Sequence, residues 1–143
     1  MKKEDRDALI SVLVSILIGA GVAWAGSQGS ASAFGVPIYA IAVALAFLIQ
    51  WVAFIPAYIQ QTERFFDLTG SITYLTVATT AVLLSPVIDG RSLLLLALVV
   101  IWAGRLGIFL FQRVRKKGKD ARFDDIKPSF ARFLSTWTLQ GLW

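Results

Sequence analysis

Four long apolar stretches, separated by short polar segments, dominate the pattern of the chain. They run over Ala8–Ala25, Val36–Tyr58, Ser71–Ile88 and Ser92–Phe111. Because roughly 20 apolar residues in a helix cross the hydrocarbon core of a bilayer, each stretch predicts a membrane-spanning helix. A fifth apolar stretch, Phe130–Trp143, is too short to span. The sequence therefore predicts an all-α, polytopic transmembrane helical bundle with four complete spans and a truncated fifth, and we expect the natural chain to continue beyond it.

The first apolar stretch allows a second interpretation. Lys2 and Lys3, the apolar run and Ala23-Trp24-Ala25 together resemble a secretory signal peptide with its cleavage site. The same region also contains three acidic residues near its start, and its apolar run is longer than that of a usual signal peptide. We therefore interpret it as the first span of a single transmembrane domain over residues 1–143.

Lysine and arginine are unevenly distributed among the polar segments. The N-terminus contains Lys2, Lys3 and Arg6, the connection over residues 26–35 contains none, and residues 113–132 contain eight. Cytoplasmic segments of membrane proteins are enriched in these two residue types. The distribution predicts that the N-terminus and the basic loop 112–129 are cytoplasmic.

The amino-acid composition limits the kinds of catalytic and binding site that the chain can form. The chain is 57% hydrophobic and 16% charged, and it contains neither cysteine nor histidine. Disulfides, thiolate or imidazole metal sites, cysteine nucleophiles and histidine bases are therefore excluded, and we expect no metal site. We also expect no nucleic-acid binding, because no basic soluble domain surrounds the basic loop. Carboxylates, hydroxyls, cations or a bound cofactor must supply any chemistry.

One charged residue, Arg105, interrupts the fourth apolar stretch. A charge at the centre of a membrane helix costs roughly 2.5–3.5 kcal/mol on insertion scales. Trp102, Arg105, Phe109 and Gln112 follow a helical spacing that places them on one face. Arg105 lies roughly 10 Å from the inner end, at 1.5 Å rise per residue. Two interpretations stay open. In the first, Arg105 has only a structural role, and its side chain extends to the interface or pairs with another residue. In the second, Arg105 lines a polar cavity that opens inward.

Other polar residues lie at similar predicted depth. Gln50 on the second helix can hydrogen-bond to Arg105 or to a shared ligand, or it makes a purely structural interhelical bond. Asp67 is the nearest acid for Arg105, although it can equally complement the helix dipole. Tyr74 is a candidate proton donor. The third helix also contains a threonine stripe, Thr69, Thr73, Thr76 and Thr80, whose hydroxyls we expect to bond mainly to their own helix carbonyls.

The most distinctive polar segment is the basic loop, RVRKKGKDARFDDIKPS over residues 113–129. Clustered cations beside a membrane helix commonly bind anionic lipid headgroups. Alternatively, the loop binds phosphate groups, with Gly118 allowing close backbone approach and the cations neutralising phosphate oxygens. Asp120, Asp124 and Asp125 interrupt the basic run, which a lipid-binding patch does not require.

Four segments resemble bacterial membrane proteins of unknown function that are related to steroid 5-alpha-reductases. They are ERFFDLTGSITY (Glu63–Tyr74), WAGRLGIFLFQR (Trp102–Arg113), GKDARFDDIK (Gly118–Lys127) and TLQGLW (Thr138–Trp143). The resemblance implies a helical membrane fold whose active site lies among the helices and opens to the cytoplasm. It also implies NADPH-dependent reduction of a carbon–carbon double bond conjugated to a carbonyl group.

The resemblance also suggests residue roles. The predicted polar cavity comprises Gln50, Trp51, Asp67, Tyr74, Trp102 and Arg105, and the predicted cofactor-binding residues are Arg113, Arg115, Lys119, Asp120 and Arg122. Trp51 and Trp102 stand where the steroid reductases have a catalytic glutamate and a catalytic tyrosine, so the sequence identifies no catalytic residue. We expect a reductase acting in the bilayer on a lipid, isoprenoid or steroid-like substrate, and we expect this chain to be only its N-terminal part, because the family's C-terminal half, with most of its cofactor contacts, is absent. A small four-helix transporter and a non-catalytic scaffold that binds anionic lipid are the alternatives.

Overall fold

The computed structural model describes residues 2–143 and contains five α-helices, one short 3-10 helix and a two-stranded hairpin. The elements, in chain order, are α1 (Lys3–Ser27), β1 (Ser32–Ala33), β2 (Val36–Pro37), α2 (Ile38–Ile59), α3 (Phe66–Leu84), α4 (Gly90–Lys117), η1 (Ala121–Phe123) and α5 (Phe130–Leu142). Helices α1 to α4 are each long and apolar enough to cross a membrane. The expectation of an all-α bundle with four spans and a shorter fifth helix is confirmed.

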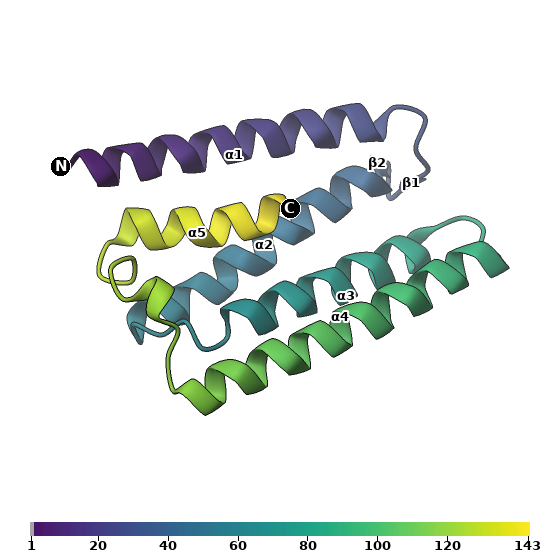
Figure 1. Cartoon of the computed structure of the whole chain (residues 1–143). Helices are drawn as coiled ribbons and strands as arrows, with labels where there is room; N and C mark the ends of the chain where they lie inside the picture. Colours follow the sequence, from purple (N-terminus) through teal and green to yellow (C-terminus); the bar gives the residue numbers. More distant parts are fainter. Residues whose placement is uncertain (1) are drawn as a thin grey trace.

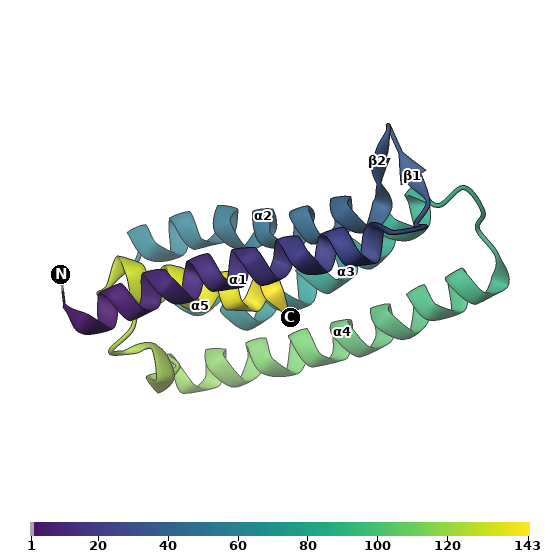
Figure 2. The same ribbon diagram turned by 90° about the horizontal axis from the view of Figure 1, so that it is seen from above.

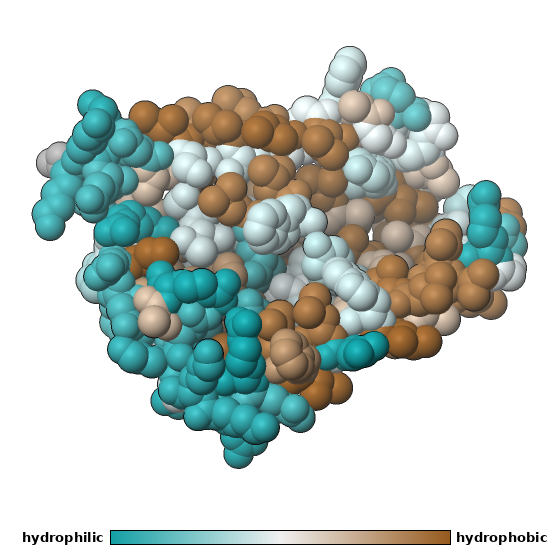
Figure 3. Space-filling view, in the orientation of Figure 1, coloured by the Kyte–Doolittle hydropathy of each residue, from teal (hydrophilic) through white to brown (hydrophobic). Residues whose placement is uncertain are grey.

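The ends of the bundle differ in character. The N-terminus, the α2–α3 connection and the α4–α5 connection lie together at one end, which we call the basic end (Figure 1). Hydrophilic surface gathers at this end, whereas apolar surface covers much of the helices (Figure 3). The alternation of the connections between two ends therefore agrees with the topology predicted from the lysine and arginine distribution.

Several helix boundaries differ from the sequence predictions. Helix α3 begins at Phe66, which places Asp67 in its first turn as the helix-dipole interpretation implied, and it ends at Leu84, before the predicted end at Ile88. Helix α4 continues through the basic residues to Lys117, so the predicted loop 112–129 begins only at Gly118. Gly118 ends the helix in the left-handed conformation, with φ of 78°, which a glycine adopts without steric cost.

Local capping explains where α4 and α5 begin. Asp89 and Ser92 form a reciprocal capping box: the Ser92 backbone N–H donates to Asp89 Oδ1 at 2.8 Å, and the Asp89 N–H donates to Ser92 Oγ at 3.0 Å. Ser129 Oγ accepts from the Arg132 backbone N–H at the start of α5. Polar residues beside the apolar stretches thus fix both helix starts.

The hairpin was not predicted. β1 and β2 pair antiparallel, with Ser32 opposite Pro37 and Ala33 opposite Val36. Its two turn residues, Phe34 and Gly35, both have positive φ, which is the conformation of a two-residue hairpin turn. The hairpin stands out from the bundle at the end opposite the N-terminus (Figure 2).

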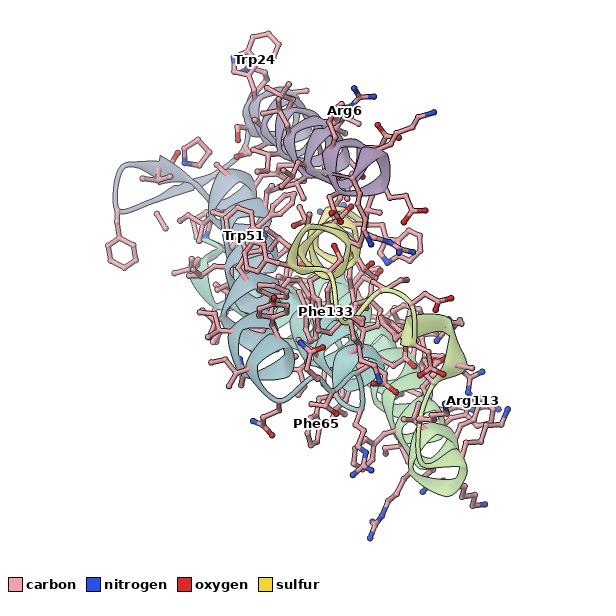
Figure 4. The ribbon with its side chains drawn as sticks, turned by 90° about the vertical axis from the view of Figure 1, so that its left-hand side faces the viewer. Arg6, Trp24, Trp51, Phe65, Arg113 and Phe133 are labelled. Atoms are coloured by element: carbon pink, nitrogen blue, oxygen red, sulfur yellow. The ribbon has the colours of Figure 1, made fainter. Side chains whose placement is uncertain are left out.

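Helix packing decides which surfaces remain open. Helix α5 packs against α1 and α2, while the main neighbour of α4 is α3. Seen end-on, α1 and α4 lie on opposite sides of the bundle (Figure 4). An aromatic core joins α2, η1 and α5 near the basic end, through Phe54, Ala57, Phe123, Phe133 and Trp137. This core positions the α4–α5 connection against the ends of the membrane helices.

Candidate functional site

A buried acid organises the basic end. The Glu63 side chain, on the α2–α3 connection, is only 3% exposed. Its carboxylate accepts a hydrogen bond from Lys127 Nζ at 2.6 Å and another from the Asp120 backbone N–H at 2.8 Å. Because a buried carboxylate is costly without partners, these two contacts tie both ends of the folded α4–α5 connection to the α2–α3 connection.

The remaining acids of this connection also form ion pairs. Lys119 Nζ lies 2.6 Å from Asp124 Oδ2. The Arg122 guanidinium binds Asp120, with Nε at 3.0 Å from Oδ1, and its Nη2 lies 3.8 Å from Asp67 Oδ2 at the start of α3. Asp67 therefore pairs with Arg122, rather than with Arg105 as the sequence had suggested.

These contacts shift the ionisation of the loop. Burial acts to raise the pKa of Glu63, but the hydrogen bonds from Lys127 and from the Asp120 backbone outweigh it and leave the pKa below its ordinary value. The hydrogen bond with Arg122 lowers the pKa of Asp120, and the hydrogen bond from Lys119 lowers the pKa of Asp124. The three carboxylates are therefore held in their charged forms at neutral pH.

The predicted cofactor-binding residues separate into two groups. Arg113, Lys119, Asp120 and Arg122 line one surface hollow of about 600 Å³, together with Val114, Lys117 and Ala121. Arg115 instead lines a slot of about 220 Å³ on another side of α4, with Arg64, Phe65, Phe111, Val114 and Gly118. Figure 4 shows Arg113 and Phe65 on different sides of the end of α4. The structure therefore does not gather the five residues around one hollow.

A buried polar cluster lies deeper in the bundle. Gln50 is fully buried; its Nε2 donates to Thr73 Oγ1 at 2.8 Å, and its Oε1 accepts from Gln140 Nε2 at 3.1 Å. Gln140 also donates to the Phe66 carbonyl at 2.8 Å. Thr69 and Thr73 each donate to the carbonyl four residues earlier, as expected for threonines in a membrane helix. The cluster joins α2, α3 and α5.

A hollow of about 260 Å³ adjoins this cluster. Residues from α1, α2, α3 and the end of α5 line it, including Thr73, Tyr74 and Gln140 among many apolar groups. Tyr74 Oη donates to the Trp143 carbonyl oxygen at 2.9 Å. The hollow thus combines an apolar wall with a few hydrogen-bonding groups, as in typical small-molecule sites.

The two tryptophans at the expected catalytic positions contact different helices. Trp51 Nε1 donates to Thr138 Oγ1 of α5 at 3.1 Å. The Trp102 ring packs edge-on against the Tyr74 ring, with 5.0 Å between their centroids. A phenol therefore lies directly beside Trp102, although it comes from α3 and not from α4.

The suggested pairing of Arg105 with Gln50 is not found in the structure. Gln50 is fully buried and bonds to Thr73 and Gln140, whereas Arg105 is exposed on α4. Ala103 and Gly107 are the buried positions of α4 near Arg105, and Gly107 packs against Ser71 of α3. Arg105 lies two residues from each, about 200° around the helix at 3.6 residues per turn, so it points away from α3. Phe109 and Gln112 share this exposed face, as the spacing predicted, while the half-exposed Trp102 lies at its edge, where its ring contacts Tyr74 of α3.

Two residues that make several of the buried contacts, Glu63 and Gln140, were not predicted from the sequence. Glu63 was noted only within a family-like segment, and Gln140 was assigned no role. Glu63 is the last acid before α3, but its burial depends on a connection that follows 57 positions later, at Asp120. The sequence contained no local signal for either contact.

Taken together, four apolar helices with a polar cluster between them define a multi-pass helical membrane protein. Residues 53–143 match the model of the family described as "Protein of unknown function (DUF1295)". Because this match covers more than half of the chain, the protein belongs to that family. No curated protein and no solved structure matches the chain significantly. The matched range includes the two connections of the basic end, Tyr74, Arg105 and Gln140, but excludes the N-terminus, Gln50 and Trp51.

Proposed function

We propose that the hollow beside Tyr74 binds an apolar lipid or steroid-like molecule that carries a carbonyl group, and that the protein reduces a carbon–carbon double bond conjugated to this carbonyl with NADPH. The observation that carries the proposal is the Tyr74 hydroxyl at the wall of the hollow, hydrogen-bonded to a carbonyl oxygen. Because the phenol has one O–H, a ligand carbonyl would accept this bond by taking the place of the Trp143 oxygen.

Tyr74 can also replace a hydroxyl group that the steroid reductases have and that this chain lacks at Trp102. Trp102 stands where those enzymes have a tyrosine, and an indole cannot protonate a carbonyl oxygen. The phenol of Tyr74 packs against the Trp102 ring and can supply the missing O–H donor from the neighbouring helix. A hydrogen bond to the carbonyl oxygen would stabilise the negative charge that develops there during reduction.

The reaction balances with one reductant and one proton. NADPH would supply a hydride to the β-carbon of the double bond and leave as NADP⁺. The electron pair of the double bond moves to the carbonyl oxygen, where Tyr74 stabilises the resulting enolate, and a proton then adds to the α-carbon. The product is the saturated carbonyl compound.

The hollow beside Arg113 fits the phosphate groups of such a cofactor. Lys119 and Arg122 already bind carboxylates, whereas no ion pair within residues 2–143 includes Arg113 or Lys117. These two cations would hold phosphate oxygens. Asp67, which contacts Arg122, precedes Tyr74 by seven residues on α3, so roughly 10 Å along the helix axis separates the two regions.

The test measures binding of each ligand to the purified protein in lipid nanodiscs. A 4-ene-3-ketosteroid serves as the enone probe, and NADPH fluorescence reports cofactor binding. We expect Tyr74→Phe to weaken enone binding about fivefold, because a hydrogen bond to a bound carbonyl contributes about 1 kcal/mol, and to leave NADPH binding unchanged. Arg113→Gln/Lys117→Gln should weaken NADPH binding and leave enone binding unchanged.

Arg91→Gln, at the start of α4 and far from the basic end, is the matched control and should change neither affinity. Wild-type protein that binds neither ligand would contradict the proposal. Equal enone binding by wild type and Tyr74→Phe would remove the role of Tyr74.

The transporter alternative gains no support from the geometry. Proton-coupled transport commonly uses a carboxylate within the membrane. The acidic residues of the described chain lie near helix ends or in connections: Glu4, Asp5, Asp7, Glu63, Asp67, Asp89, Asp120, Asp124 and Asp125. The reductase proposal therefore accounts for more of the observed polar groups.

A further inference from the structure

We propose that the slot at the basic end of α3 and α4 is a binding site for one anionic phospholipid. Arg64, Phe65, Phe111, Val114, Arg115 and Gly118 line this slot, which has a volume of about 220 Å³. The phosphate would lie between the two arginines, and the first part of an acyl chain would lie along the two phenylalanines. This proposal is independent of the reductase proposal, because it uses a different side of α4.

The charge of the slot is not neutralised within the described chain. Neighbouring Lys119, Arg122 and Lys127 each bind a carboxylate. By contrast, Arg64 and Arg115 are exposed, and no ion pair among residues 2–143 includes either. Two exposed arginines line this slot, and guanidinium groups can donate several hydrogen bonds to the oxygens of one phosphate.

Below the arginines, the wall of the slot is apolar. The Phe65 and Phe111 rings stack with 6.1 Å between centroids and an interplanar angle of 22°. Phe65 is 53% exposed, while Val114 behind it is buried. A phospholipid presents the matching order of groups along its length: a charged phosphate at the interface and hydrocarbon just below it.

Helix-dipole complementation does not explain the whole arrangement. Arg115, Lys116 and Lys117 lie in the last turn of α4, where cations stabilise the negative end of a helix. Arg64, however, belongs to the α2–α3 connection and lines the same slot from another segment. Cations converging from two segments on a slot at the membrane interface favour a bound anion.

The location of the slot favours a lipid over a soluble phosphate. It lies between the ends of two helices that are apolar enough to span a membrane, so its apolar wall faces the outer part of the hydrocarbon layer. Arginine near such a surface is attracted to anionic lipids by about 1 kcal/mol per residue. Two arginines therefore correspond to roughly a 30-fold preference for phosphatidylglycerol over a zwitterionic lipid.

The test titrates the detergent-solubilised full chain with phosphatidylglycerol and counts bound lipids by native mass spectrometry. We expect one tightly bound lipid on the wild type, and affinity roughly 30-fold weaker on Arg64→Gln/Arg115→Gln. Lys2→Gln/Lys3→Gln removes the same charge at the same end of the bundle and should retain wild-type affinity. Arg64→Lys/Arg115→Lys, which keeps the charge, should retain most of the binding.

Three outcomes would overturn the proposal. The first is unchanged phosphatidylglycerol affinity in Arg64→Gln/Arg115→Gln that retains the wild-type helix content. The second is equal affinity for phosphatidylcholine, which would indicate a purely apolar contact. The third is displacement of the lipid by millimolar inorganic phosphate, which would indicate a site for soluble phosphate.

Discussion

At the scale of single residues, the buried carboxylate of Glu63 holds the two connections of the basic end together. Its buried carboxylate accepts from the backbone of Asp120 and from Lys127, so it holds the α4–α5 connection at both ends. The lysines and arginines suggested a phosphate site in the sequence, yet three of them are bound by carboxylates in the fold. The number of lysines and arginines alone therefore overstates the positive charge that is available to bind a ligand.

Replacing Glu63 tests this organising role. We expect Glu63→Gln to lower the stability of the protein by about 1–3 kcal/mol, because the largely buried Lys127 ammonium loses the closer of its two charged partners and keeps only Asp124 at 3.9 Å. The thermal midpoint in detergent at neutral pH measures the loss. Asp125→Asn, at an exposed residue of the same connection, is the control and should leave the midpoint unchanged.

The effect of Glu63→Gln on stability should depend on pH. The pKa of Glu63 in the folded protein lies below its ordinary value of 4.5. Its contribution to stability is therefore fully present above that value and is lost as pH falls through the folded pKa. The difference in midpoint between wild type and Glu63→Gln should persist from neutral pH down to pH 4.5 and shrink only as the pH falls further, through the lowered pKa of the folded state. A constant difference at all pH values would contradict this role.

Among the helices, α3 and α4 approach each other closely at Gly107. A Cβ atom at Gly107 would lie 2.6 Å from Ser71 Oγ and 2.7 Å from Ser71 Cβ. The Ser71 Cβ is fixed to its backbone, so the helices would have to separate. Small residues commonly allow such contact in membranes. Gly104 lies on the same helix, three residues before Gly107, but a Cβ atom at Gly104 would have no neighbour within 4 Å.

The two glycines provide a matched pair of variants. We expect Gly107→Ala to destabilise the protein by about 1–3 kcal/mol through overpacking. Gly104→Ala should be neutral or slightly stabilising, because alanine favours the helix by up to about 1 kcal/mol. Thermal midpoints of both variants in the same detergent measure the difference, and equal midpoints would show that the α3–α4 contact tolerates separation.

Over the whole molecule, the connections alternate between two ends, and the cations gather at one of them (Figure 1, Figure 3). The helices are apolar over most of their exposed surface, which includes Leu13, Leu48, Leu83 and Leu98. Both features agree with a multi-pass membrane protein. By the positive-inside rule, the basic end is expected to face the cytoplasm.

Cysteine labelling tests this orientation, because the chain has no native cysteine. Ser32→Cys lies in the hairpin and Asp125→Cys lies in the α4–α5 connection. A membrane-impermeant maleimide should label Ser32→Cys in intact cells and Asp125→Cys in inside-out vesicles. The reverse pattern would place the basic end outside, and labelling of both residues from one side would contradict the four-span topology.

The number of spans, their approximate ends and the grouping of the connections were predictable from the sequence. These features depend on local hydropathy and on charge counts, which are read directly along the chain. The exposed stripe of Trp102, Arg105, Phe109 and Gln112 was predictable too, since helical spacing is a local property. The roles of Arg105 and of the cofactor-binding residues stay predictions.

The direction in which each helix face points, and the pairing of the charges, depend on tertiary packing. A membrane helix is apolar toward lipid and toward its neighbours alike, so its pattern does not distinguish the two sides. The sequence around Arg105 therefore did not indicate that this residue points away from Gln50. Likewise, the partners of Gln50, Glu63 and Asp67 come from segments tens of residues away, and only packing brings them together.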